Sequence, residues 1–423
     1  MRNRQIRLSA LLLAASFLLT GCGGAASTSS IAEETHVQIT EAPETEPPTT
    51  EAPATEAPTD PPVELDIKMT LEEKVYQLFI VTPEALTGYG QVVSAGEATQ
   101  AALQERHVGG LIYFSENMES LSQTMDMLQA TQEFAFENGG IGLFLAVDEE
   151  GGEVARCGDK LGTSQLDPMK TYGDRNDHTE ALKIGQTLGR TLSVLGFNVD
   201  FAPVADVNLN ANNELGDRIF SSNPDVVANM VDGVVTGIQD DHKVAATLKH
   251  FPGLGAGDGN THDDNKVVVK RTLDQLREAE FIPFKSGIDA GAGFVMVTHA
   301  TVTGVGDNLP SCLSPVVCTD LLRNELGFEG IIITDSMQMN TISEVHEPGE
   351  AAVKAIKAGC DMILIPADLD EAVAGVIEAV KKGEISENRI NASVKRILDE
   401  KKALDIFQRE QEETTEESEE SEE

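Results

Sequence analysis

The sequence contains no tryptophan, and aromatic residues occupy only 4% of its 423 positions. Stacking on aromatic rings is therefore expected to add little to whatever the protein recognises. Positive charge is scarce as well, because 31 lysines and arginines stand against 71 aspartates and glutamates, for a net charge of −40. Such a chain would repel phosphates, and this disfavours nucleic acid as a partner.

Cysteine is also rare. Apart from Cys22, the cysteines are scattered and show neither a Cys-x-x-Cys pair nor a zinc-type spacing; they are Cys157, Cys312, Cys318 and Cys360. We expect buried free thiols, with a disulfide between Cys312 and Cys318 as the alternative. The carboxylates are spread over separate strand ends without ligand spacing, so neither a metal nor a cofactor is implied.

The chain opens without a full membrane-spanning run, because the apolar stretch at 8–19 is too short for a comfortable transmembrane helix. Three arginines precede it, and Leu-Thr-Gly-Cys at 19–22 follows, which resembles the cleavage and lipidation box of bacterial lipoproteins. The resemblance implies a signal peptide over 1–22, a lipid carried by Cys22, and an extracytoplasmic protein anchored to the bacterial cell membrane. An ordinary signal peptide with a chance cysteine is the alternative.

Two further segments lack the apolar side chains that a core needs. Residues 23–65 include "EAPETEPPTTEAPATEAPTDPP", an imperfect repeat of Glu, Ala, Pro and Thr. Such a composition predicts an extended, disordered linker that holds the folded part away from the membrane. Residues 408–423 are almost all Glu, Ser and Thr from Glu410 onward, which predicts a solvated, disordered acidic tail.

The segment between them, residues 66–407, alternates short apolar runs with helical patterns. The runs are 77–81, 110–114, 143–147, 199–204, 244–248, 294–297, 330–333 and 362–366, and helices are predicted at 225–239, 273–290 and 315–326. Continuous apolar runs are typical of parallel strands buried on both faces. Eight of them predict an α/β fold with a single (β/α)8 TIM-type barrel. An open doubly wound sheet is the alternative, because a strand count does not show closure.

The first run has a second interpretation. Thr70 and Glu73 have the spacing of a capping box, which predicts a helix that starts there. Residues 77–81 could equally be the end of that helix.

Polar side chains follow five of the predicted strands, where each strand ends. They are Asp148, Asp206, Lys249 with His250, His299 and Asp335. The carboxyl ends of barrel strands converge on one mouth, which is where barrel enzymes carry out their chemistry. The sequence therefore predicts an active site at this end of the barrel.

Five motifs occur in order along this segment: "VDEEGGEVAR" (147–156), "LGFNVDFAPVADVN" (195–208), "GDRIFSSNP" (216–224), "KHFPGLG" (249–255) and "GIIITDSMQM" (330–339). Together they resemble glycoside hydrolase family 3, and most closely its bacterial single-domain β-N-acetylglucosaminidases. The resemblance implies a TIM barrel and a retaining exo-β-N-acetylglucosaminidase. Its substrates would be terminal β-GlcNAc residues of cell-wall-derived or other glycans.

The resemblance also implies roles for individual residues. Asp335 takes the position of the catalytic nucleophile, and His262, thirteen residues after Lys249, takes that of a general acid/base on a mobile glycine loop. The positions that bind the hydroxyls of the terminal sugar are Asp148, Arg156, Arg218, Lys249 and His250.

One departure from the family pattern concerns this acid/base. The family has an aspartate two residues before the histidine, where it pairs with the ring, but this chain has Asn260. We therefore expect either a more acidic optimum or a substitute carboxylate from Asp258 or Asp263. Two other functions stay open: a broader β-glycosidase or glycoside phosphorylase of the same family, and a catalytically weak sugar-binding lipoprotein.

Overall fold

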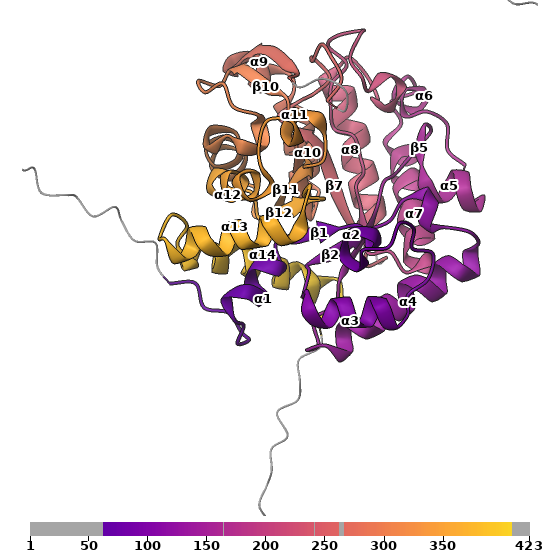
Figure 1. The fold of residues 1–423 in the computed structure, drawn as a ribbon. Coiled ribbons are helices and arrows are strands. Elements are labelled where there is room, and N and C mark those ends of the chain that lie inside the picture. The colour runs from indigo at the N-terminus through magenta and orange to yellow at the C-terminus, as the bar shows by residue number, and fades with distance from the viewer. Residues whose placement is uncertain (1–61, 164, 241, 262–265, 408–423) are drawn as a thin grey trace, which may run out of the picture. The chain divides into compact units, whose positions relative to one another are not determined.

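Eight parallel strands form a closed barrel in the order β1-β12-β11-β9-β7-β6-β3-β2 (Figure 1). The structure, a computed structural model, describes residues 62–407 except 164, 241 and 262–265. The barrel strands are β1 (Phe79–Val81), β2 (Gly110–Ile112), β3 (Phe144–Val147), β6 (Val199–Asp200), β7 (Ala245–Phe251), β9 (Phe294–Val297), β11 (Ile331–Ser336) and β12 (Met362–Leu364). All eight predicted strands are confirmed, and closure between β1 and β12 excludes the open sheet.

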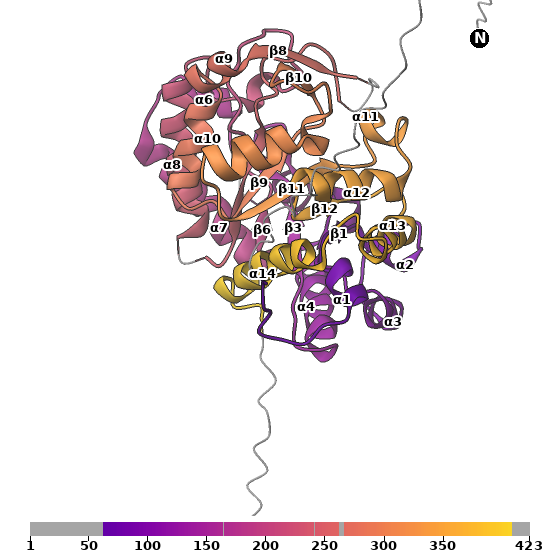
Figure 2. The ribbon, with the colours of Figure 1, turned by 90° about the vertical axis from the view of Figure 1, so that its left-hand side faces the viewer.

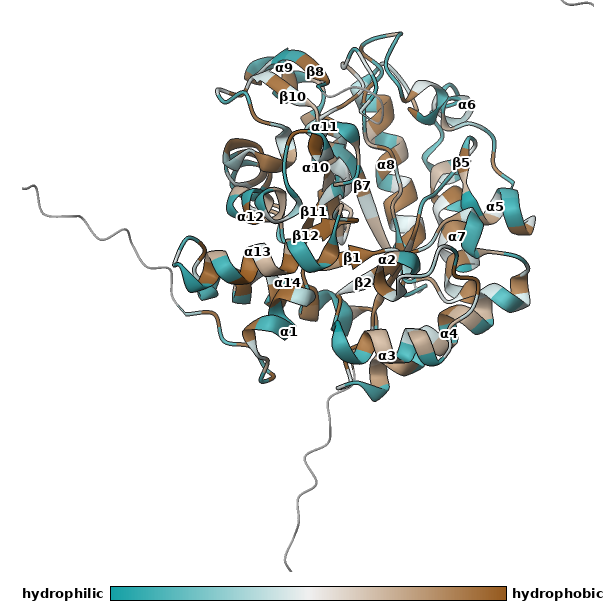
Figure 3. Cartoon of the chain, viewed as in Figure 1, coloured by the Kyte–Doolittle hydropathy of each residue, from teal (hydrophilic) through white to brown (hydrophobic). Residues whose placement is uncertain are grey.

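The apolar runs form strands because both of their faces are covered. Every residue of β1, β2, β3, β9 and β12 is buried. In Figure 3 the strands are coloured mainly as hydrophobic, whereas the surrounding helices carry polar residues on their outer sides. Burial on both faces removes the alternation of a half-exposed strand, which is why the sequence shows continuous runs.

Helices surround the barrel (Figures 1 and 2). They are α1 (Leu71–Tyr76), α2 (Pro83–Thr87), α3 (Glu97–Glu105), α4 (Leu121–Glu137), α5 (Arg156–Leu161), α6 (Met169–Gly173), α7 (His178–Leu195), α8 (Pro224–Gln239), α9 (Leu273–Glu278), α10 (Phe281–Asp289), α11 (Asn340–Ser343), α12 (Pro348–Ala358), α13 (Leu369–Lys381) and α14 (Glu387–Ala403). Shorter turns are η1 (Ser115–Asn117), η2 (Gly216–Arg218) and η3 (Ser311–Leu313), and η4 (Val316–Glu325) is π-helical. None of the helices within the described ranges is both long and apolar enough to cross a membrane.

The start of the barrel resolves the open interpretation of residues 77–81. The predicted capping box is present, since the Thr70 hydroxyl accepts from the backbone of Glu73 and the Glu73 carboxylate accepts from the backbone of Thr70. The helix that it caps ends at Tyr76, and β1 begins at Phe79. The run therefore contains a turn followed by a strand.

The single helix predicted at 273–290 is wrong, because the chain forms two helices there, α9 and α10. The break falls at Ala279, whose backbone is not helical. Beside it, the Glu280 carboxylate is buried and accepts two hydrogen bonds from the Arg271 guanidinium, at 2.7 and 2.9 Å. The ion pair thus lies at a helix break that local propensity does not reveal.

Two small sheets follow barrel strands at the carboxyl-terminal mouth. The β4–β5 hairpin (Glu149–Gly151 and Val154–Ala155) comes directly after β3. A parallel pair, β8 (Val268–Thr272) and β10 (Thr301–Gly304), follows β7 and β9 and lies at the opposite end of the barrel from α14 (Figures 1 and 2). These additions enlarge the rim around the predicted site.

The four cysteines of the barrel are buried free thiols, as the first interpretation of the sequence expected. The alternative disulfide between Cys312 and Cys318 is not formed. The sulfur of Cys318 lies 3.7 Å from that of Cys360 instead. Sequence proximity was misleading because η4 carries Cys318 toward α12 and the strand that follows it.

Candidate active site

The strand ends bring the predicted residues of the mouth together. Asp148 follows β3, Lys249 and His250 are among the last three residues of strand β7, and Asp335 lies near the end of β11. The peptide bonds Lys249–His250 and Phe251–Pro252 are cis. Side chains of the two neighbouring β7 residues reach different partners, so they serve different parts of the site.

Lys249 is held in a buried ion network. Its Nζ atom lies 2.6 Å from Oδ1 of Asp148 and 2.7 Å from Oε1 of Glu150. Nε and Nη2 of Arg218 donate to the same Glu150 carboxylate at 2.8 and 2.7 Å. Two predicted sugar-binding cations are therefore joined through one carboxylate, and the predicted Asp148 closes the network.

The electrostatics of this network favour the charged forms. Burial raises the pKa of Glu150, but Lys249 and Arg218 lower it more, so that the pKa falls to about 2. Burial opposes the charge of Lys249, yet Asp148 and Glu150 raise its pKa above the ordinary value. All charged donors are thus present at neutral pH, and charged donors bind hydroxyl oxygens more strongly than neutral ones.

His250 is oriented by Asp206, which follows β6 and is fully buried. Oδ2 of Asp206 lies 2.8 Å from Nδ1 of His250 and also accepts from the His250 backbone N–H at 2.9 Å. Its other oxygen accepts from the backbone of Leu254. Because a carboxylate accepts, Nδ1 carries the proton of this bond, and Nε2 is the ring atom that remains for a ligand.

Asp335 is a buried carboxylate, 7% exposed, among cationic or ionisable neighbours. Burial raises its pKa, but His299, His250, the Ser336 N–H and Lys249 lower it more, so that the net pKa lies below the ordinary value. His299, the strand-end residue of β9, is itself fixed by a 2.8 Å contact between Nε2 and the Ser336 carbonyl. These neighbours favour the ionised form of Asp335, which is the form in which a carboxylate can act as a nucleophile.

Arg156 is the first residue of α5, which follows the β4–β5 hairpin. Glu149 holds this turn, because its carboxylate accepts from the backbone of Cys157 at 2.7 Å and of Gly158 at 2.9 Å. Burial raises the pKa of Glu149 to about 7. Nε of Arg156 is buried and has no hydrogen-bond partner within the described part of the chain, which fits a donor that awaits a ligand.

Sequence reasoning gave no role to either glutamate of the "DEEGG" motif. The two are adjacent in β4, so their side chains point to opposite faces of the strand. Glu150 consequently meets Lys249 and Arg218, whereas Glu149 meets the start of α5. This alternation was the available signal, but composition alone could not tell which glutamate faces the site.

Several predictions are not tested. His262, Asp263 and Cys22 lie outside the described residues, as do most of the predicted linker and the predicted tail. Asn260 is described and partly buried, and Asp258 is exposed with its backbone paired to Val268. The proposed substitution of the missing aspartate by Asp258 or Asp263 stays a prediction.

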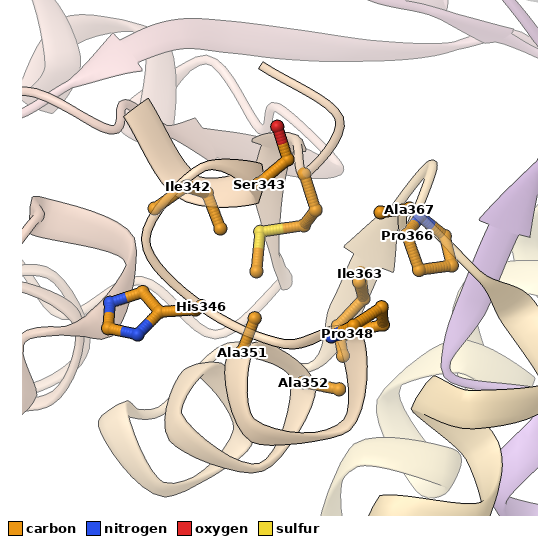
Figure 4. Close-up of a pocket in the computed structure, with 10 residues that line it drawn as sticks. Ile342, Ser343, His346, Pro348, Ala351, Ala352, Ile363, Pro366 and Ala367 are labelled. Atoms are coloured by element: carbon orange, nitrogen blue, oxygen red, sulfur yellow. The ribbon is translucent and has the colours of Figure 1, made fainter. Parts of the chain in front are cut away.

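Two hollows lie away from this network. One, lined mainly by apolar side chains such as Ile342, Ala352 and Ile363, with the His346 ring at its side, is shown in Figure 4. Its volume of about 10 Å³ accommodates one water molecule and no sugar. The other, of about 430 Å³, is bounded by the end of α7 and by Leu404 and Ile406. The end of α7 leads into β6 from the amino-terminal side, which is the face that barrel enzymes do not use for chemistry.

The described residues contain no group of three or more His, Cys, Asp or Glu side chains placed to hold a metal ion. What the mouth offers is a buried ionised carboxylate beside a set of charged hydrogen-bond donors. The fold and this site together define a TIM-barrel protein with an enzyme-type site at its carboxyl-terminal mouth.

The family follows from comparison with known proteins. The model of the glycosyl hydrolase family 3 N-terminal domain matches residues 70–399, and the chain therefore belongs to this family. Among curated relatives, β-hexosaminidase A of Pseudoalteromonas piscicida is 32% identical over 319 residues, which cover 69% of this chain and 52% of the relative. The β-hexosaminidase of Nitrosomonas eutropha is 33% identical over 282 residues, 65% of this chain and 78% of the relative.

The fold has solved counterparts. The structure of a glycoside hydrolase family 3 β-N-acetylglucosaminidase from Paenibacillus sp. str. FPU-7 has a TM-score of 0.75 and 34% identity, covering 80% of this chain and 63% of that one. The chain thus spans about half the length of the first curated relative and less than two thirds of this structure.

Proposed function

We propose that the protein is a retaining exo-β-N-acetylglucosaminidase that hydrolyses terminal β-GlcNAc residues. The observation that carries the proposal is Asp335, a buried carboxylate with a lowered pKa at the end of a barrel strand, surrounded by His250, His299 and Lys249. Membership of family 3 and the β-hexosaminidase names of relatives support the choice of sugar.

In the first step, the Asp335 carboxylate attacks the anomeric carbon as the glycosidic C–O bond breaks, which gives a glycosyl ester. His262 donates its proton to the departing oxygen. In the second step, water gives a proton to His262 and its oxygen attacks the anomeric carbon. The ester bond breaks, the carboxylate is restored, and the sugar is released with its original anomeric configuration.

Binding of the terminal sugar falls to the charged groups of the mouth. Lys249, Arg218, Arg156 and His250 supply donors, and Asp148 supplies an acceptor for hydroxyls. Lys249 and Arg218 are already held by carboxylates, so little side-chain ordering is required when the sugar arrives.

We also propose that the protein acts outside the cytoplasm, anchored to the bacterial cell membrane through a lipid on Cys22. The Leu-Thr-Gly-Cys sequence at 19–22 supports this location. Wall-derived glycans would then be the nearest substrates. Mass spectrometry of the mature N-terminus, with and without globomycin, tests the anchor, and an unmodified N-terminus beyond Cys22 would contradict it.

The decisive test of the activity is release of nitrophenol from the β-GlcNAc and β-glucose derivatives by the full chain. We expect faster release from β-GlcNAc, none from Asp335→Ala, and the β-anomer as the first product seen by proton NMR. Initial appearance of the α-anomer would contradict the retaining mechanism.

The same assay separates the other functions. Equal release from both derivatives would indicate a broader β-glycosidase. Turnover that is faster in phosphate than in an inert buffer, with a sugar phosphate as product, would indicate a phosphorylase. No release from either derivative, together with measurable GlcNAc binding, would indicate a sugar-binding protein.

A further inference from the structure

The glycine-rich segment after β7, residues 253–261, is fastened to a second loop. This loop, residues 208–216, follows β6, and we call it the strap. The backbone N–H of Asn210 donates to the Gly255 carbonyl at 3.0 Å, and its side-chain amide donates to the Gly257 carbonyl at 2.7 Å. A β-carbon at Gly255 would lie 2.2 Å from the carbonyl oxygen of Val207, the residue just before the strap. Glycine is thus required for this close approach.

The last contact of the strap is made by Glu214. Its carboxylate accepts from the backbone N–H of Thr261 at 3.1 and 3.2 Å and from the Thr261 hydroxyl at 3.0 Å. The strap holds Glu214 in place through a local turn, in which the Asn213 side-chain oxygen accepts from the Leu215 N–H at 2.9 Å. Thr261 is consequently fixed at both its donors by one carboxylate.

A second element fixes Thr261 from another side. The hydroxyl of Thr341 donates to the Thr261 carbonyl at 2.9 Å. Thr341 lies in α11, six residues after Asp335 in the sequence. Thr261, which is 2% exposed, is therefore tied both to the strap and to the segment that follows the proposed nucleophile.

We propose that Glu214 and Thr341 are positioning residues for the hydrolytic reaction, acting through Thr261 on its neighbour in sequence, His262. The inference rests on the proposed function, in which His262 is the general acid/base. Displacing an acid/base by about 1 Å can cost on the order of 100-fold in rate. A clamp on the adjacent residue is a direct way to prevent such a displacement.

Acid catalysis has a kinetic signature that a purely structural defect lacks. A poor leaving group such as phenol needs the proton, whereas 2,4-dinitrophenol departs without it. The parameter kcat/KM reports the steps up to the glycosyl-enzyme, in which only the acid role of His262 matters. Loss of positioning should therefore lower kcat/KM for phenyl β-GlcNAc and spare the dinitrophenyl derivative.

The experiment compares Glu214→Ala, Glu214→Gln and Thr341→Val with wild type and with His262→Ala on both substrates. For phenyl β-GlcNAc we expect kcat/KM to fall about 10- to 100-fold in Glu214→Ala. Glu214→Gln retains an acceptor oxygen, so its loss should be smaller. For the dinitrophenyl substrate, kcat/KM should change less than about 2-fold in all variants, His262→Ala included. Unchanged circular dichroism shows that each variant is folded.

Glu84→Gln is the matched control. Its carboxylate fastens a different rim loop, because Oε1 accepts from the Val92 backbone at 2.8 Å and from the Asn117 amide at 2.7 Å. We expect no dependence on the leaving group there.

Each remaining outcome overturns a defined statement. Glu214→Ala could lower kcat/KM equally for the two substrates, or for neither, while His262→Ala shows the leaving-group dependence. In that case the positioning role is wrong and the proposed function stands. If His262→Ala itself shows no such dependence, the acid/base assignment is wrong and the inference falls with it.

Discussion

Replacing Glu150 with glutamine is expected to destabilise the protein strongly, because this carboxylate is the shared counter-ion of Lys249 and Arg218. The side chain is 1% exposed, so solvent does not screen its charge. Its pKa falls from 4.5 to about 2 on folding. A shift of this size corresponds to about 3 kcal/mol of preference for the ionised form. Glutamine would lose that preference and leave two buried cations short of one negative charge, so we expect a loss of roughly 3 to 5 kcal/mol.

The sign of the pH dependence follows from the lowered pKa of Glu150. Its contribution to the free energy of unfolding is complete above pH 4.5 and is lost as the pH falls through about 2. Wild type should therefore lose stability over this window faster than Glu150→Gln. The difference between them at pH 3 should be about two fifths of the difference at pH 7.

Urea unfolding at several pH values measures this difference. Far-ultraviolet circular dichroism is the suitable signal, because the chain has no tryptophan to report by fluorescence. Glu325→Gln serves as the control, since Glu325 makes the same two-bond contact with an arginine, Arg277, on the surface. The urea midpoint of Glu325→Gln should stay close to that of wild type, because exposed ion pairs contribute little to stability. Equal stability of Glu150→Gln and wild type at pH 7, or a difference independent of pH, would refute the charge argument.

Three further outcomes are expected. Asp335→Asn should lower kcat for nitrophenyl β-GlcNAc by at least about 1,000-fold with an unchanged circular dichroism spectrum. A variant whose kcat stays within about 10-fold of the wild-type value would contradict the role of Asp335 as nucleophile. Burial raises the pKa of Asp335, but His299 and His250 lower it more, so the acidic limb of kcat/KM that belongs to this group should lie below pH 3.8; a limb near pH 5 would contradict this. Burial lowers the pKa of Lys401 from 10.5 to about 7, so its charge opposes folding at neutral pH. Lys401→Met should raise stability at pH 7 by about 1–3 kcal/mol despite the lost bond to Gln77, with a gain that shrinks toward pH 10; a loss of stability would refute the argument.

The barrel could be predicted from the sequence because its strands are buried on both faces. Residues 294–297 and 331–333, for example, are apolar and buried at every position, on the face toward the barrel core and on the face toward the helices. Closure was not contained in the pattern, since an open sheet covered by helices requires the same runs. It depends on the pairing of Phe79 with Ile363, two residues almost 300 positions apart.

The site also contains some residues that could be predicted from the sequence and others that could not. Asp335, Lys249 and His250 could be placed at the mouth because five predicted strand ends carry Asp, Lys or His, and the carboxyl ends of barrel strands meet at one face. Glu214 could not, because its contact with Thr261 joins two loops, and neither loop has a periodicity that states which partner it meets. Glu150 was hidden beside Glu149, whose carboxylate holds a helix start instead.

These contacts give the site two parts with different physical origins. Lys249 and Arg218 carry charges that would be costly to bury alone, and the carboxylates of Asp148 and Glu150 offset that cost before any ligand arrives. Their positions are consequently set by the barrel. The glycine-rich segment is held by hydrogen bonds instead: the strap fastens it through bonds that end at Thr261, Asp206 accepts from the Leu254 backbone, and Thr341 donates to the Thr261 carbonyl. A change in the strap should therefore alter the reaction without weakening the network that grips the sugar, whereas a change at Glu150 should do both.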